Sequence, residues 1–474
     1  MRKRTVKILK IIAIVLVVLS LIYAIAVGVS GAKLRRAYAD LKKDGRPMKQ
    51  TDVIPPEVPD TENAALLYES AILLLKAQPA PEGNLLEYLG EGRQAVNDME
   101  MSAAPEGNLL EYLGGLSDKF IKETIDPDKL VELQRLIEQD IVTQALSVVE
   151  QASHRRSCRF DHDYMAGFNM LMPNLSGLRD IIRILGAKAC LEAEAGRPDA
   201  AWDLAQTQLR LADALRNEPI LISQLVRFAS IRTSCETIFK ICEVAPPNAE
   251  QYRSLESLLS NYEGNTPLVL AMDGERLLCG EWAFDLLRTG SAKSLAAITS
   301  QESGLGLGEV LLSLYSAFKP LSLADHAAYV RLMGDYTRFV QQPYSPNEAS
   351  AMDKKVEQTR SRLHVVTSML APAIGRVKEL HWELIAKIHI TRIGLAMLQY
   401  KKVQGAFPQT LESLNLKDVG DPFSDGPLLY RANPNGFILY SVGPDQKDNN
   451  GSPKEKKEKK ETNWDIVWFY TGER

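Results

Sequence analysis

The densest group of chemically reactive side chains lies in the run HRRSCRFDHDY, at positions 154–164. On a helix, Cys158 and His162 would share one face because they are four positions apart. Asp161 or Asp163 could then hold or charge the neighbouring imidazole. If Cys158, His162 and Asp161 converge in a pocket, they would suit a metal-dependent or hydrolytic enzyme.

The same run also has a purely structural interpretation. Arg155, Arg156 and Arg159 lie beside Asp161 and Asp163 in the sequence, so these charges can pair with one another on an exposed loop. The sequence contains no HExxH, GxSxG, phosphate-binding-loop or dinucleotide-binding motif. We therefore predict that the chain is not an enzyme and keep the enzyme hypothesis as the alternative.

The remaining histidines and cysteines indicate packing rather than chemistry. His381 and His389 lie eight positions apart in a segment that is expected to be one long helix. The cysteines are odd in number and contain no CxxC pair, which excludes a zinc ribbon or a thioredoxin motif. We predict free thiols that are buried as small apolar groups, at Cys158, Cys190, Cys235, Cys242 and Cys279.

The bulk composition is that of an ordinary globular protein. Hydrophobic residues make up 45% of the chain and charged residues 24%, so real hydrophobic cores can form. The formal net charge of −4 leaves no overall basic field to attract nucleic acid. We therefore expect no nucleic-acid partner.

The N-terminal region predicts a single membrane span. Residues Ile11 to Val29 form an uncharged apolar run that is long enough to cross a bilayer as a helix. The segment before this run is more basic than the segment after it, which favours a cytoplasmic N-terminus. We predict a cytoplasmic tail at 1–10, a transmembrane helix at 11–30 and a stalk and linker at 31–62. A cleaved signal peptide is the alternative, and the body is exported in either case.

The middle of the chain predicts a helical body. Residues 63–373 carry apolar side chains at helical spacing, interrupted by Gly and Pro. Within it, LEAEAGRPDAAWDLAQTQLRLADAL has Gly196 where one helix should end and Pro198 where the next should begin. This segment resembles one tetratricopeptide-type helical hairpin, and no second copy follows in register.

The pattern changes near the C-terminus, at 374–474. A long helix is predicted over Ile374 to Gln404, ending at a glycine. Leu428–Arg431 and Phe437–Val442 then alternate with period two, and the Asn-Gly pair between them predicts a hairpin. Trp464–Trp468 is expected to be a last strand.

This order of elements resembles the globular head of the major pseudopilin of type II secretion systems. The matching segments are LQYKKVQGAFPQTLESL after the long helix, DPFSDGPLLYR at a strand start, and FILYSVGPDQKDNNG followed by NWDIVW at the end. The resemblance covers about residues 385–470. It implies a small α+β domain in which a long helix packs on a short antiparallel sheet.

The resemblance also implies a calcium site, because the last loop of that family binds calcium. Asp445, Asp448 and Asp465 lie where the family has its ligands, and Asn449 and the backbone near Ser441 would add oxygens. Calcium takes six to eight such oxygen ligands. Calcium is therefore the expected cofactor.

The chain departs from the family in three places. Gln446 stands where the family has a glycine, and the lysine-rich insert PKEKKEKKE lengthens the loop at 453–461. The prepilin cleavage motif is missing from residues 1–30. We therefore expect the head to be carried as a module, without polymerisation into a pseudopilus.

Taken together, these features predict a mainly α-helical fold with a small α+β C-terminal domain. We expect a single-pass protein of the bacterial inner membrane, with a cytoplasmic N-terminus and a periplasmic body. The expected function is that of an interaction or scaffold protein with protein partners in the cell envelope, and the resemblance links it to a type II secretion or pilus-like assembly. A stand-alone calcium-binding envelope protein is a further alternative.

Overall fold

The computed structural model describes residues 2–81, 107–289, 315, 317–359, 364–370, 374–416, 419–424, 426–433, 435–453 and 464–472. Helices account for 69% of the structure. In the described residues, the strands form one three-stranded antiparallel sheet near the C-terminus. The predicted mainly helical fold with a small sheet at its end is confirmed.

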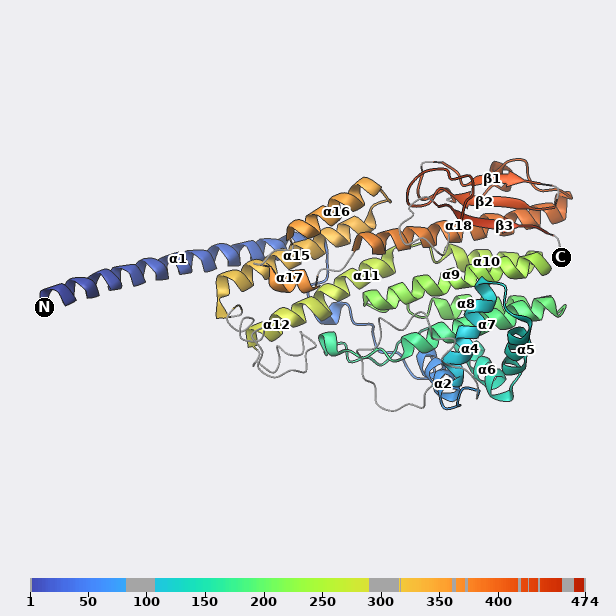
Figure 1. The fold of residues 1–474 in the computed structure, drawn as a ribbon, viewed down its shortest axis with the longest axis horizontal. Helices are drawn as coiled ribbons and strands as arrows, with labels where there is room; N and C mark the ends of the chain where they lie inside the picture. The colour runs from blue at the N-terminus through green and yellow to red at the C-terminus, as the bar shows by residue number, and fades with distance from the viewer. Residues whose placement is uncertain are drawn as a thin grey trace.

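Helix α1 (Arg2–Lys43) projects from one end of the molecule and then continues into the body (Figure 1). All its side chains from Lys7 to Ile25 are exposed, and this apolar part is long enough to cross a membrane. Beyond it, Ser30, Leu34, Ala37 and Leu41 are buried along one face, at helical spacing. The helix therefore extends past the predicted span, through the first part of the segment that was expected to be a stalk.

The buried face of α1 packs against α15 (Lys319–Gln341). Leu34, Ala37 and Leu41 form a small hydrophobic cluster with Ala327 and Val330 of that helix. The helices that surround this contact are α11 (Thr266–Gly274), η4 (Glu275–Gly280), α12 (Glu281–Thr289), α16 (Pro346–Thr359) and α17 (Val365–Leu370).

The rest of the body is a bundle of helical hairpins. Polar caps fix several helix starts, as where Asn63 accepts from Ala65 N and Asn248 forms a capping box with Gln251. The helices are α2 (Ala64–Lys76), α4 (Leu109–Lys122), α5 (Pro127–Ile137), α6 (Asp140–Ser153), α7 (Asn174–Glu194), α8 (Pro198–Ala212), α9 (Leu221–Val244) and α10 (Ala249–Ser260).

The predicted hairpin is present as α7 and α8. Gly196 adopts a positive φ of 76° in the turn, and Pro198 occupies the first turn of α8. Helix α7 runs through Gly186, where a Cβ atom would lie 2.5 Å from Thr237 Oγ1 and 2.6 Å from Gln208 Nε2. A glycine at this position therefore allows α8 and α9 to approach α7 closely.

The C-terminal region consists of one long helix and the sheet. Helix α18 (Ile374–Gln404) is followed by η5 (Leu411–Leu414) and by strands β1 (Leu429–Ala432), β2 (Phe437–Ser441) and β3 (Ile466–Tyr470). The strands lie in the order β1-β2-β3, and Leu439 pairs with Trp468 in the register of the last two. The sheet packs on α18 at the end of the molecule opposite the N-terminus (Figure 1).

Helix α18 and the sheet share one hydrophobic core with the helical body. The indole of Trp468 on β3 stacks on Phe239 of α9, with ring centroids 4.0 Å apart. A Cβ atom at Gly394 would lie only 2.0 Å from the indole, so α18 also approaches this ring closely. Arg392 of α18 forms ion pairs with Glu256 of α10 and with Glu263, just after α10, at 2.5 Å each. The C-terminal region is therefore packed into the body.

Candidate functional site

The cluster at 154–164 is a loop, so the prediction that Cys158 and His162 share a helical face is wrong. Helix α6 ends at Ser153, and the chain then runs extended beside the start of α2. The side chain of Asn63 donates to the carbonyl of Arg159 at 2.8 Å and accepts from its N–H at 2.9 Å. Because this amide satisfies both backbone groups of Arg159, the segment needs no helical hydrogen bonds there.

The extended chain directs alternate side chains to opposite sides. Phe160, His162 and Tyr164 are buried, while Asp161 and Asp163 are exposed. Asp161 is therefore not in a pocket with His162. The residues Phe160 to Tyr164 do alternate between apolar or aromatic and acidic side chains in the sequence, but the i, i+4 spacing of Cys158 and His162 was interpreted as helical instead.

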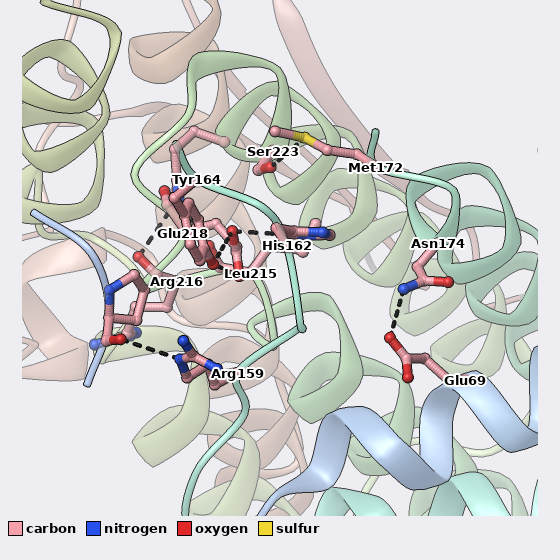
Figure 2. Close-up of polar contacts among 12 residues, drawn as sticks. Glu69, Arg159, His162, Tyr164, Met172, Asn174, Leu215, Arg216, Glu218 and Ser223 are labelled. Atoms are coloured by element: carbon pink, nitrogen blue, oxygen red, sulfur yellow. Dashed lines mark hydrogen bonds and ion pairs between the residues drawn. The ribbon is translucent and has the colours of Figure 1, made fainter. Parts of the chain in front are cut away.

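His162 and Tyr164 both point toward a buried glutamate, Glu218, in the loop after α8 (Figure 2). The hydroxyl of Tyr164 donates to the Glu218 carboxyl at 3.1 Å, and His162 Nε2 lies 3.9 Å from Glu218 Oε2. Burial raises the pKa of Glu218 to about 7 and lowers the pKa of His162. Near neutral pH the carboxyl of Glu218 is therefore partly protonated, whereas the imidazole of His162 is uncharged.

Cys158 is not activated as a nucleophile. Burial raises the pKa of its thiol, so the thiol stays protonated at neutral pH. In the described residues, no three His, Cys, Asp or Glu side chains lie close enough together to hold a metal ion. The convergence of Cys158, His162 and Asp161 that the enzyme hypothesis required is therefore absent.

The predicted calcium ligands lie in the loop between β2 and β3, where the carboxylates of Asp445, Asp448 and Asp465 do not come together as a group of three that could hold a metal ion. Asn449 donates from its side chain to Asp445 at 3.2 Å and from its backbone to Asp465 at 3.4 Å. Asp448 accepts from Asn450 N at 2.7 Å and from the hydroxyl of Tyr440 at 3.0 Å. Most of the lysine-rich insert lies outside the described residues.

Two details bear on whether this loop suits calcium. Burial and the nearby charge of Asp448 raise the pKa of Asp465, although the N–H of Gly451 donates to it at 2.7 Å. A cation would relieve the repulsion between these carboxylates. The hydroxyl of Ser441 instead donates to the buried Asp421 at 2.7 Å, so only the backbone of Ser441 is left as a ligand. The oxygens present are of the kind that calcium binds, and the site stays a prediction.

The junction between α1 and the body contains a polar cluster that sequence reasoning missed. Tyr38 of α1 donates to Glu281 of α12 at 2.7 Å, and His326 of α15 lies 2.9 Å from the same carboxylate. The ring of His326 stacks on Phe284 at 4.1 Å. These residues are far apart in sequence, and no spacing pattern connects them.

No protein-family model, no curated protein and no solved structure matches the chain. Any functional conclusion therefore rests on the geometry described above.

Proposed function

We propose that this chain is a membrane-anchored scaffold protein of the bacterial inner membrane, with its body on the periplasmic side. The observation that carries the proposal is the continuity of α1. One helix contains both the exposed apolar segment and the face that packs on α15. A body attached in this way keeps a fixed orientation relative to the bilayer, which a flexible linker would not provide.

Aromatic side chains support a body that lies close to the bilayer surface. Tyr23, within the apolar part of α1, contacts Phe318 just before α15 with ring centroids 5.5 Å apart. Aromatic residues are typical of the membrane–water interface. The start of α15 would then lie close to the bilayer.

The far end of the molecule is where a partner would bind. The sheet lies opposite the N-terminus (Figure 1), so a fixed α1 presents the sheet away from the membrane. The resemblance of this region to a pseudopilin head favours a partner in a secretion or pilus-like assembly. A calcium-stabilised loop between β2 and β3 belongs to the same proposal.

The topology is tested by labelling introduced cysteines in intact cells with a membrane-impermeant maleimide. The expected result is that Gln134→Cys, on exposed α5, is labelled once the periplasm is accessible, while Lys7→Cys is labelled only after lysis. Cys158 is partly exposed and the other native cysteines are buried, so the unmodified chain is the background control. The reverse labelling pattern would overturn the proposed orientation.

The scaffold role is tested with a photo-reactive amino acid in place of Phe469, which is 46% exposed on β3. Full-length protein in native membranes is expected to crosslink there to an envelope protein. Ala37→Glu places a charge in the contact between α1 and α15 and should abolish the crosslink without releasing the chain from the membrane. Ala39→Glu, on the exposed face of the same helix, is the matched control. A crosslink that survives Ala37→Glu would show that the fixed orientation is not required.

A further inference from the structure

An open cleft of about 400 Å³ lies between α2, α8, α10 and the loop that follows α6. Its size is within the range of small-molecule sites. The charged residues of its lining are four arginines and one aspartate. They are Arg155, Arg156, Arg210, Arg216 and Asp213.

The single carboxylate of the lining is already neutralised. Asp213 forms an ion pair with Arg216 at 2.7 Å and another with Arg227 at 2.6 Å, and Arg227 is buried. The charge of Asp213 is therefore neutralised by its arginine partners. The other arginines of the lining have no carboxylate in the lining to balance their positive charge. A surplus of this kind in a concave site attracts anions.

The arginines differ in how firmly they are held. Arg155 donates from Nη1 to the carbonyls of Asp60 and Asn63, at 2.7 and 2.6 Å, which positions its guanidinium beside the cleft. Arg156 is exposed and makes no hydrogen bond or ion pair with any other described residue. The guanidinium of Arg155 is thus held in one position. The guanidinium of Arg156 is not held by other residues, so it can move to bind a ligand in the cleft.

A tyrosine hydroxyl in the wall of the cleft also lacks a protein partner among the described residues. Tyr68 of α2 is only 2% exposed, and among the described residues nothing accepts from or donates to its hydroxyl. This hydroxyl is not one of the buried atoms that lack a partner, so it reaches the water in the cleft and is free to bond a ligand there. Tyr262, in contrast, donates to the carbonyl of Leu209 at 3.0 Å. The Tyr68 hydroxyl is therefore available to donate to a ligand oxygen in the cleft.

We propose that this cleft binds a small organic oxyanion, with its carboxylate or phosphate group held by Arg156 and Arg210 and accepting a hydrogen bond from Tyr68. The ligand is a soluble molecule and not a lipid headgroup, since α2, α6 and α8 lie in the half of the molecule remote from the N-terminus (Figure 1). Cys158 also lines the cleft, and its protonated thiol adds no negative charge that would repel an anion.

The experiment is isothermal titration of the full-length protein in nanodiscs with pyrophosphate and, separately, with citrate. At least one of these probes is expected to bind saturably, and raising the salt concentration should weaken the binding. The probe that binds more tightly identifies the ligand as a phosphate or as a carboxylate. Failure of both probes to bind at millimolar concentration would overturn the proposal.

Variants distinguish binding in this cleft from nonspecific attraction of anions by surface charge. Tyr68→Phe should weaken binding about tenfold, as expected for the loss of one hydrogen bond to a charged group. It removes no hydrogen bond from the unliganded protein, so the melting temperature without ligand should not fall. Arg210→Gln should weaken binding at least as much. Arg253→Gln, an exposed arginine of α10 outside the cleft, is the control, and an equal loss of binding in this variant would contradict the assignment.

Discussion

The hydroxyl of Tyr38 on α1 donates a hydrogen bond to the carboxylate of Glu281, which lies 243 positions later in the chain, at 2.7 Å. His326 approaches the same carboxylate at 2.9 Å. Burial raises the pKa of Tyr38, while the contacts with His326 and Tyr38 outweigh burial and lower the pKa of Glu281. Tyr38 and His326 therefore hold the charged carboxylate of Glu281 in place at the junction of α1 and the body.

We predict that Tyr38→Phe destabilises this junction by about 1–3 kcal/mol, because Glu281 loses a donor in a buried position. The measurement is chemical unfolding of the full-length protein in detergent. Tyr400→Phe on α18 is the matched control, since the hydroxyl of Tyr400 makes no hydrogen bond to any described residue. Equal stability of the two variants would show that the Tyr38 hydrogen bond does not stabilise the docked helix.

A second prediction concerns the buried carboxyl of Glu218. Its folded pKa of about 7 lies above the value of 4.5 for an unburied glutamate, so the folded chain binds the proton more tightly. The resulting stabilisation is complete below pH 4.5 and is lost as the pH rises through 7. Glu218→Gln keeps an acceptor for Tyr164 and should raise the free energy of unfolding at pH 8 by about 1–3 kcal/mol, with little change near pH 4.5.

The test is a pair of unfolding curves at pH 5 and pH 8 for the wild type and Glu218→Gln. Glu150→Gln, at an exposed position of α6, serves as the control. The same stability difference at both pH values would contradict the raised pKa of Glu218.

Local patterns predicted much of the secondary structure. The predicted helix over Ile374 to Gln404 coincides with α18, and the predicted strand at Phe437–Val442 lies within one residue of β2. Both segments carry their signal locally, in apolar spacing and in the glycine and Asn-Gly turns that follow or precede them. The last strand is shifted, from the predicted Trp464–Trp468 to Ile466–Tyr470, because its register is set by pairing with β2.

The candidate sites were harder to predict, since their partners are distant in sequence. The sequence identified His162 as reactive but paired it with Cys158, whereas its neighbour in the structure is Glu218. Tyr68 had no signal, because a tyrosine among apolar helix positions has the pattern of a core residue. What distinguishes Tyr68 is the absence of a partner among the described residues, which only tertiary packing determines.

A third prediction tests whether the C-terminal sheet is part of the body. Trp468→Ala removes the ring that stacks on Phe239 and should lower the free energy of unfolding of the whole protein by about 3–5 kcal/mol. Phe469→Ala changes the next residue of β3, which faces the opposite side and is 46% exposed. Phe469→Ala should lower the free energy of unfolding much less than Trp468→Ala. Loss of the sheet alone in Trp468→Ala, with α9 still protected from hydrogen exchange, would show that the two parts unfold separately.

A fourth prediction concerns calcium and uses the full-length protein, because α18 and the sheet share their core with the body. Thermal unfolding should shift upward in calcium relative to a chelator. A ligand that binds only the folded state adds about 2.7 kcal/mol at a hundredfold excess over its Kd. Asp445→Asn combined with Asp448→Asn should abolish the shift, since each change removes a charged oxygen ligand.

Asp203→Asn, at an exposed position of α8 far from the loop in sequence, is the control and should keep the full calcium shift. A wild-type protein that melts at the same temperature in calcium and in chelator would contradict the calcium site. The carboxylates of the loop would then serve only as acceptors for its own N–H groups, as Asp465 does for Gly451. The scaffold proposal would survive that result, because it rests on the continuity of α1 and not on the loop.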